Sequence, residues 1–190
     1  MNASAENRGG VRLTVDMSLD ELRVLTALDA LVHEEAVLVA IDRIVGHVEE
    51  ELGRDASAVM AWQPIPLAVY GSALLPSIRS SWVFVLRAGA TTGAERHPNS
   101  LQRVMSYRGG GDLQTIVDSR WRSNELLSDP QAPLERRWAS IPVNVWHQAV
   151  VPGQNWVVVS FHTASEHELI EERPDGDRTR QRLYYVEGHK

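Results

Sequence analysis

The side chains of Glu95, His97 and Gln102 are of types that bind metal ions, and their spacing in the sequence allows them to bind the same ion. Glu95 and His97 stand two residues apart, so on an extended strand both side chains project from the same face and can reach one ion. Gln102 follows the Pro98-Asn99 turn and begins another strand, which can return its amide group to the same point across a hairpin. Imidazole, carboxylate and amide groups all bind divalent metals. The stretch therefore predicts a metal site.

The absence of cysteine restricts the ligands that such a site can use. None of the 190 residues is a cysteine. Neither a disulfide framework nor a thiolate metal site can form. Any metal must be bound by histidine, carboxylate or amide side chains, which are the types found at positions 95, 97 and 102.

Two motifs resemble those of the cupin superfamily. Gly89 to Gly109 reads Gly-x5-Glu-x-His-x4-Gln-x6-Gly, similar to the first cupin motif, which usually has His-x-His followed by Glu. Pro142 to His147 resembles the second motif, usually Pro-x-Gly-x2-His-x3-Asn, with Asn144 in the Gly place. The separation of the two motifs is also similar to that in the family. The resemblance covers residues 60–165 and leaves the N-terminal part outside it.

The resemblance implies four metal-binding residues: Glu95, His97, Gln102 and His147. Glu95 stands where the family usually has His, and Gln102 stands where it usually has Glu. The set is still a 2-His-1-carboxylate site with open positions, in which Gln102 binds the ion or orients a bound water. Fe²⁺ is the expected ion, with Zn²⁺, Mn²⁺ and Ni²⁺ as alternatives.

Such a site implies an enzyme that acts on a small oxygen-bearing molecule, because an ion with open positions can bind and polarise it. Resemblance to cupin dioxygenases favours dioxygenase-like oxidoreductase chemistry for Fe²⁺, while Zn²⁺, Mn²⁺ or Ni²⁺ would suit isomerase, lyase or hydrolytic chemistry. Two other classes stay open: a non-catalytic cupin that binds or senses a small molecule, and a metal-independent sugar isomerase or epimerase with His97 as base and Tyr107 as acid. Metal content distinguishes the first class from the other two.

Arg103, Tyr107 and His162 are the candidate catalytic residues outside the ligand set. Arg103 or Arg96 could anchor an anionic substrate through bidentate hydrogen bonds. His162 lies in the expected strand after the second motif and is a candidate for proton transfer or for orienting a ligand. The expected partner is therefore a small-molecule substrate, and the arginines would allow it to be an anion.

The residues before the motifs predict helices. Residues 1–12 are expected to form a flexible tail and residues 13–55 a helical segment. Ser18 to Glu21 has the Ser-x-x-Glu form of a capping box, which starts a helix. Apolar residues recur every three or four positions from Leu22 to Leu52, which predicts one long helix or two with a joint near residues 33–35.

Residues 56–190 predict a cupin β-barrel with a short C-terminal helix and strand. Short apolar runs separated by Pro and Gly are typical of antiparallel sandwiches and barrels. Ser165 to Glu168 repeats the capping-box form and predicts the short helix, which extends to about Glu172. The expected fold is mainly β, a cupin-type antiparallel β-barrel (double-stranded β-helix or jelly roll) with an N-terminal helical segment. Expected strands are 82–86, 102–107, 113–117, 137–141, 146–150, 156–161 and 182–186.

Composition excludes some partners. The formal net charge of −6 argues against a nucleic-acid-binding surface, which needs an excess of Lys and Arg. No apolar run approaches the ~20 residues that span a bilayer, and the first ten residues lack the apolar region of a signal peptide. We therefore expect a cytoplasmic protein of one domain with neither nucleic acid nor membrane as partner. The resemblance implies a homodimer, because many cupins pair through their sheets.

Overall fold

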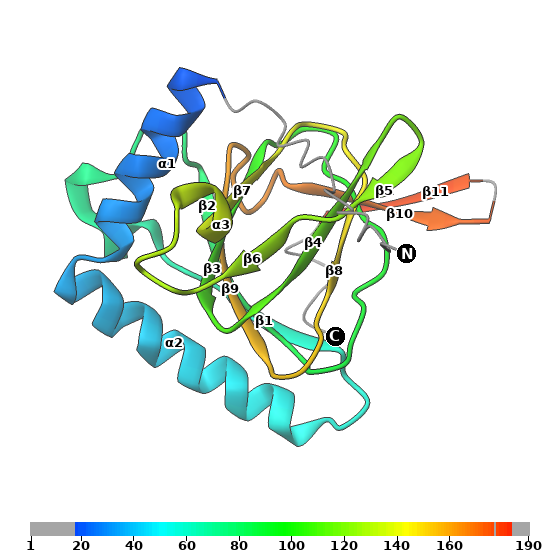
Figure 1. Ribbon diagram of the computed structural model, residues 1–190, viewed down its shortest axis with the longest axis horizontal. Coiled ribbons are helices and arrows are strands. Elements are labelled where there is room, and N and C mark those ends of the chain that lie inside the picture. Colours follow the sequence, from blue (N-terminus) through cyan, green and yellow to red (C-terminus); the bar gives the residue numbers. More distant parts are fainter. Residues whose placement is uncertain (1–17, 177, 184–190) are drawn as a thin grey trace, which may run out of the picture.

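Two long helices, two packed β-sheets and a separate two-stranded hairpin make up most of the described fold. The computed structural model describes residues 18–176 and 178–183, so the expected tail at 1–12 lies outside the described residues. The helices α1 (Leu19–Val32) and α2 (Glu35–Arg54) run along the outer side of one sheet (Figure 1). Neither they nor any other described helix has the length and apolar character needed to cross a membrane.

The first sheet contains five antiparallel strands in the order β1-β2-β9-β3-β7. Its strands are β1 (Met60–Pro64), β2 (Ser80–Leu86), β3 (Gln102–Arg108), β7 (Trp138–Ile141) and β9 (Trp156–His162). A 3₁₀ segment, η1 (Leu67–Ala73), connects β1 to β2, and the short α3 (Leu134–Arg137) leads into β7.

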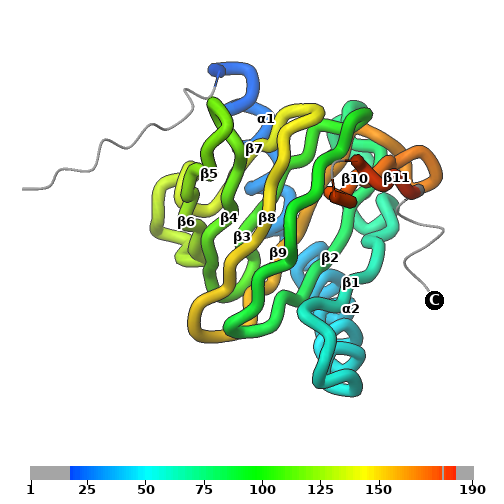
Figure 2. Tube along the Cα trace, turned by 90° about the vertical axis from the view of Figure 1, so that its right-hand side faces the viewer, coloured from blue at the N-terminus to red at the C-terminus, as the bar shows by residue number. Residues whose placement is uncertain are grey.

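The second sheet is centred on β4 (Gly110–Val117). Its neighbours are β8 (His147–Val150) on one edge and, on the other, β5 (Arg120–Arg122) and β6 (Glu125–Leu127). The segment 91–96 continues the layer, because Thr91 and Glu95 bridge β8 and Arg96 bridges β10 (Ile170–Asp175). β10 forms a hairpin with β11 (Arg178–Leu183), seen beside the barrel in Figure 2.

The chain alternates between the sheets in jelly-roll order. From β2 it passes to the segment 91–96 in the second sheet, returns to the first sheet as β3, and then enters β4, β5 and β6. It returns again as β7, crosses to β8 and ends between β2 and β3 as β9. Double sheets connected in this way are jelly rolls, the architecture that includes cupins. The expected fold class, mainly β with an antiparallel cupin-type barrel and N-terminal helices, is confirmed.

β9 is buried on both faces and separates two cores. Trp156 and Val158 point into the barrel, while Val157 and Val159 point toward the helices. This alternation explains why β9 reads as a continuous apolar run. Between the first sheet and the helices the core includes Leu25, Leu28, Val37, Ile41, Val45, Val83 and Val85, and between the sheets it includes Leu86, Val104, Leu113, Leu126 and Ala149.

Polar contacts fasten α1 to the first sheet. The Ser18 hydroxyl accepts the Glu21 amide at 3.1 Å, as the capping pattern predicts. The Glu21 carboxylate does not complete the box, because it accepts two hydrogen bonds of 2.8 Å from Arg103 and another from Ser140. The break between α1 and α2 falls at residues 33–34, which confirms the expected joint.

Asp29, also on α1, makes a second connection to the sheet. Its carboxylate accepts both terminal nitrogens of Arg137, one of them at 2.9 Å, and the indole nitrogen of Trp138 at 2.8 Å. These partners are more than a hundred residues away along the chain. The helix α1 is therefore held by these two ion pairs as well as by its apolar face.

These ion pairs predict acid sensitivity. Burial is the largest single influence on Glu21 and Asp29 and opposes their ionisation. Hydrogen bonds from the arginine partners, from Ser140 to Glu21 and from Trp138 to Asp29, together with the arginine charges, outweigh burial and lower both pKa values. A lowered folded-state pKa stabilises the fold above the ordinary pKa, and this stabilisation is lost as the pH falls through the folded-state value. We expect a Glu21→Gln/Asp29→Asn double variant to show a flatter decline in unfolding free energy than wild type between about pH 5 and pH 3. Urea denaturation across this range measures the slopes, and parallel curves would contradict the prediction.

The expected short helix at residues 165–172 is absent, and this corrects the sequence prediction. Only a turn forms at residues 166–168, within which the Ser165 hydroxyl donates to Glu168 at 2.5 Å. Glu172 instead exchanges two backbone hydrogen bonds of 3.0 and 2.9 Å with Arg96. Pairing with a distant strand therefore overrides the local capping signal, and β10 begins at Ile170.

Candidate metal site

Glu95, His97 and His147 meet on the inner face of the second sheet. Glu95 and His147 lie directly opposite each other, joined by backbone hydrogen bonds of 2.9 and 2.8 Å. His97 is two residues beyond Glu95 and shares its face. One ligand atom from each of the three residues lies within 4.8 Å of the others. The structure thus brings together three of the four metal ligands expected from the sequence.

Backbone carbonyl groups orient the two imidazoles. Nδ1 of His147 lies 3.1 Å from the Val145 oxygen, and Nδ1 of His97 lies 2.9 Å from the Ile170 oxygen. Because a carbonyl oxygen only accepts hydrogen bonds, each Nδ1 donates, and Nε2 is the ring nitrogen that can bind an ion when the imidazole is neutral. Nε2 of His147 is buried without a hydrogen-bond partner among the described residues, 3.5 Å from Oε1 of Glu95.

Gln102, the fourth expected ligand, reaches the same place from the first sheet. It is buried, and its Oε1 atom has no hydrogen-bond partner in the described part of the chain. Gln102, Glu95 and His147 line one cavity of about 50 Å³. The rest of this cavity wall is mostly apolar, with Phe84, Leu113, Trp156 and Val158 among its residues.

The donor set fits a divalent metal ion. Two imidazoles and a carboxylate with room beside them are the ligands of a 2-His-1-carboxylate site. A buried polar atom without a partner costs about 1–3 kcal/mol, and His147 Nε2 and Gln102 Oε1 both belong to residues that line the cavity. An ion with its bound water would satisfy both atoms.

The charge state of the cluster also suits metal binding. Burial opposes the ionisation of Glu95, but His147, Arg173 and His97 lower its pKa to about 2. Burial and the neighbouring His147 lower the pKa of His97 to about 4. At neutral pH the cluster therefore contains a carboxylate and a neutral His97 imidazole, which are the protonation states that bind metals.

The β10–β11 hairpin supports Glu95 from behind. The bridge between residues 96 and 172 places Arg173 opposite Glu95 and Glu171 opposite His97. Arg173 donates to Glu95 Oε2 at 2.5 Å and to Glu171 at 2.6 Å. Glu171 is fully buried and also accepts from Arg182 at 2.8 Å. Arg173 thus holds Oε2 while Oε1 faces His147.

Sequence reasoning missed the contribution of Glu171, Arg173 and Arg182. A signal exists for the second strand of the hairpin, where Arg178, Arg180 and Arg182 alternate with Thr179 and Gln181, the period of a strand with one charged face. The expected helix at residues 165–172 concealed the first strand, to which Glu171 belongs.

Arg103 and Arg96 lie away from the cluster. Arg103 follows the inward-facing Gln102 and so projects outward, where it is paired with Glu21 of α1. Arg96 lies between two inward-facing residues, and it donates to Glu172 at 2.6 Å and covers the Trp146 ring at 4.6 Å. This placement corrects the expectation that either arginine anchors a substrate at the cluster.

Tyr107 also faces outward. Its hydroxyl donates to Asp42 of α2 at 2.9 Å, on the opposite side of the first sheet from the barrel interior. The acid–base pair of Tyr107 and His97 expected for a metal-independent isomerase is therefore not formed, which corrects that alternative. The outer side of β3 is covered by helices, so polar residues on it find helical partners.

His162 lies beside the cluster. It is buried on β9, and its ring centre is 5.1 Å from that of His97. Its ring nitrogens lie 3.4 Å from the Ser100 hydroxyl and 3.3 Å from the Ser160 hydroxyl. Burial and the neighbouring His97 lower the pKa of His162. The structure thus places a third imidazole, that of His162, next to the candidate ligands.

The two glycines of the first motif occupy backbone conformations that favour glycine. Gly89 has a φ of 76° and Gly109 a φ of 82°, in the left-handed region. A Cβ at Gly109 would also lie 2.8 Å from the Asn155 carbonyl oxygen. Each glycine marks a turn at one end of the region that carries Glu95, His97 and Gln102, which gives the motif spacing a physical reason.

The fold and the cluster define a jelly-roll barrel with a buried carboxylate–imidazole site. No protein-family model matches the chain, and no curated protein matches it. Among solved structures, the chain is similar to the capsular polysaccharide assembling protein CapF from Staphylococcus aureus, with 13% identity and a TM-score of 0.45. The match covers 57% of this chain and 29% of that one.

The chain is also similar to two enzymes, with comparable sequence identity and TM-score. Lactobacillus farciminis oxalate decarboxylase, in a formate complex, shares 14% identity over 56% of this chain and 30% of its own, with a TM-score of 0.43. Oxalate oxidase in complex with the substrate analogue glycolate shares 16% identity over 56% of this chain and 53% of its own, also with a TM-score of 0.43. The chain spans less than a third of the length of CapF and of the decarboxylase that it matches.

Proposed function

We propose that the protein is a metal-dependent cupin enzyme that acts on a small oxygen-bearing molecule, with dioxygenase-like oxidoreductase chemistry. The observation that carries the proposal is the buried cluster of Glu95, His97 and His147 beside a cavity that also meets Gln102. Glu95, His97 and His147 would bind the ion, and Gln102 would bind it or orient its water. When bound, Fe²⁺ supplies a redox-active Lewis acid with open positions.

The protein's own residues orient the ligands and supply an apolar wall beside them. Arg173 fixes one oxygen of Glu95 and leaves the other directed at His147. Phe84 and Trp156 contribute an apolar wall, which strengthens electrostatic interactions inside the cavity. The cavity of about 50 Å³ has room for one or two water-sized groups, so only a very small substrate, or the reacting end of a larger one, fits beside the ion.

A non-catalytic cupin that binds a small molecule is the second candidate, and one observation favours it. Arg173 forms an ion pair of 2.5 Å with Glu95 and so balances its charge without a metal ion. A site already neutral in this way can serve as a polar pocket. Metal content separates the two candidates.

The test is metal content and metal affinity of the purified full-length protein. We expect about one equivalent of Fe, Mn, Zn or Ni in wild type, and at least about a hundredfold weaker binding in His147→Ala and Glu95→Ala, which each remove a ligand. Elemental analysis followed by titration with Fe²⁺ under anaerobic conditions gives both quantities.

His47→Ala is the matched control, because His47 is an exposed imidazole on α2. It should bind metal as wild type does. A wild-type protein that stays metal-free after reconstitution would overturn the metal-dependent proposal. The non-catalytic small-molecule-binding protein would then be the better candidate. Equal loss in His47→Ala and His147→Ala would show adventitious binding to surface histidines.

A further inference from the structure

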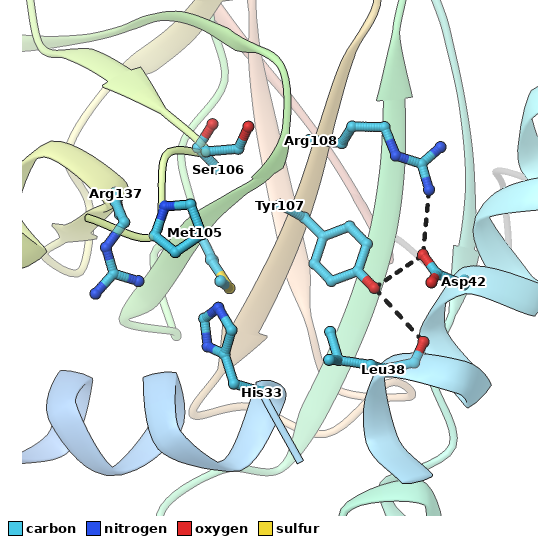
Figure 3. Close-up of a pocket in the computed structure, with 10 residues that line it drawn as sticks. His33, Leu38, Asp42, Met105, Ser106, Tyr107, Arg108 and Arg137 are labelled. Carbon is cyan, nitrogen blue, oxygen red and sulfur yellow. Dashed lines mark hydrogen bonds and ion pairs between the residues drawn. The ribbon is translucent and has the colours of Figure 1, made fainter. Parts of the chain in front are cut away.

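A second cavity, of about 320 Å³, lies outside the barrel between the helices and the outer face of β3. Figure 3 shows His33, Leu38 and Asp42 on the helical side, facing Met105 and Tyr107 on β3. Its volume falls at the lower end of the range for small-molecule sites, about 300–1,000 Å³. None of its lining residues belongs to the candidate metal site, so its role is separate from the proposed function.

A β-bulge shapes one wall of this cavity. The register between β3 and β9 shifts between Ser106 and Arg108, which makes Tyr107 an extra residue. Tyr107 and Arg108 both turn toward α2, where their side chains donate to the same oxygen, Oδ1 of Asp42, at 2.9 and 3.1 Å (Figure 3). Bulges redirect side chains in this way and are common beside functional sites.

The polar groups at this wall leave an acceptor for a ligand. Oδ1 of Asp42 takes both donors, and within the described residues Oδ2 makes no hydrogen bond. Nδ1 of His33 lies 2.7 Å from the Asp29 carbonyl oxygen and donates to it. A ligand that donates hydrogen bonds complements Oδ2 of Asp42.

The charges around the cavity favour a cation. Arg108 is paired with two carboxylates, Asp42 at 3.1 Å and Glu49 at 3.2 Å, so this group carries a net charge of about −1. Arg137, also at the cavity, is neutralised by its ion pair with Asp29. The guanidinium groups are therefore already satisfied, and the unbalanced charge belongs to a carboxylate.

Three apolar residues and two serines, Ser106 and Ser128, also line the cavity. Leu38, Met105 and Pro130 are the apolar residues, and Tyr107 adds an aromatic ring, a group that attracts cations. A carboxylate beside an aromatic ring and aliphatic side chains complements an ammonium group attached to a short apolar body. We propose that this cavity binds a small organic amine, with the ammonium group on Asp42 Oδ2 and the apolar part against Leu38, Met105 and Tyr107.

The test uses three probes of nearly equal shape with the full-length protein: benzylamine, benzyl alcohol and benzoate. We expect benzylamine to bind with a dissociation constant of about 1 mM, benzyl alcohol about tenfold more weakly, and benzoate not measurably. Chemical-shift perturbation in NMR spectra measures the affinities and locates the probe at Leu38 and Met105. Benzoate binding as tightly as benzylamine, or no benzylamine binding at about 20 mM, would overturn the proposal.

Variants assign the effect to the cavity. Asp42→Asn keeps the shape and should weaken benzylamine binding about tenfold, while Tyr107→Phe keeps the ring and should have a smaller effect. Glu50→Gln removes the same charge from an exposed part of α2 and should change nothing. Leu38→Phe fills the cavity without altering charge and should abolish binding even if Asp42→Asn is unstable. Equal losses in Glu50→Gln and Asp42→Asn would show a nonspecific charge effect and contradict the assignment.

Discussion

Gly111→Ala is expected to lower the free energy of unfolding by about 3 kcal/mol, the upper part of the range for overpacking in a core. A Cβ at this position would lie 2.3 Å from a ring carbon of Trp156. The ring cannot move away easily, because Trp156 is fully buried and its indole nitrogen donates to Ser106 at 2.8 Å. Trp156 also lines the cavity beside the candidate metal site, so the variant should bind metal more weakly as well.

Gly46→Ala provides the matched control with the opposite sign. Gly46 lies inside α2, and a Cβ there would meet nothing within 4 Å. Alanine in a helix interior is more stable than glycine by about 0.5–1 kcal/mol, so this variant should be stabilised. Urea denaturation of both variants measures the difference, and a Gly111→Ala protein as stable as wild type would contradict the close packing of Trp156.

The sequence predicted the cluster because the relations that define it are mostly local. Glu95 and His97 share a face through the two-residue period of a strand, and the positive φ angles of Gly89 and Gly109 account for the motif spacing. The joint between α1 and α2 was also predicted, since capping and apolar periodicity are encoded within a few turns. The match between Glu95 and His147 needed the family resemblance, because the strands that carry them are distant in sequence.

The prediction that Arg103 anchors a substrate was wrong, and the sequence contained the information needed to avoid this error. If Gln102 faces the interior, the two-residue period requires that Arg103 face outward. The alternation was available in the sequence, but it does not reveal that helices cover the outer face and supply Glu21 as a partner. Because helices pack on the outer face of β3, polar residues on that face also find hydrogen-bonding partners.

The hairpin that supports Glu95 could not be predicted from local signals. Ser165 to Glu168 has the pattern of a helix start, and the structure keeps only one turn of it. Pairing of Glu172 with Arg96, across more than seventy residues, decides the outcome. Non-local strand pairing commonly overrides local propensity in this way.

Asp29→Ala is expected to lower the free energy of unfolding by about 3–5 kcal/mol. It leaves the guanidinium group of Arg137, only 10% exposed, without its bidentate partner. It also leaves the indole nitrogen of Trp138 unpaired in a residue that is 1% exposed. An uncompensated buried charge costs more than the ion pair contributes.

Comparison with an exposed ion pair isolates the effect of burial. Glu50→Ala breaks a pair with Arg54 in which both side chains are at least 68% exposed, and it should cost under about 0.5 kcal/mol. In the double variant Asp29→Ala/Arg137→Met the loss should be less than the sum of the single losses, because the charge is removed together with its partner. Equal effects of Asp29→Ala and Glu50→Ala would contradict this account.

The form of the unfolding transition then tells whether helices and barrel fold as one unit. Asp29 connects α1 to residues that begin the β7 edge of the first sheet, and the apolar faces of both helices are buried against the same sheet. If this contact is part of a single cooperative core, Asp29→Ala should shift one transition, seen identically by circular dichroism and by tryptophan fluorescence. Separate transitions would mean that the helices detach while the barrel and its candidate metal site remain folded.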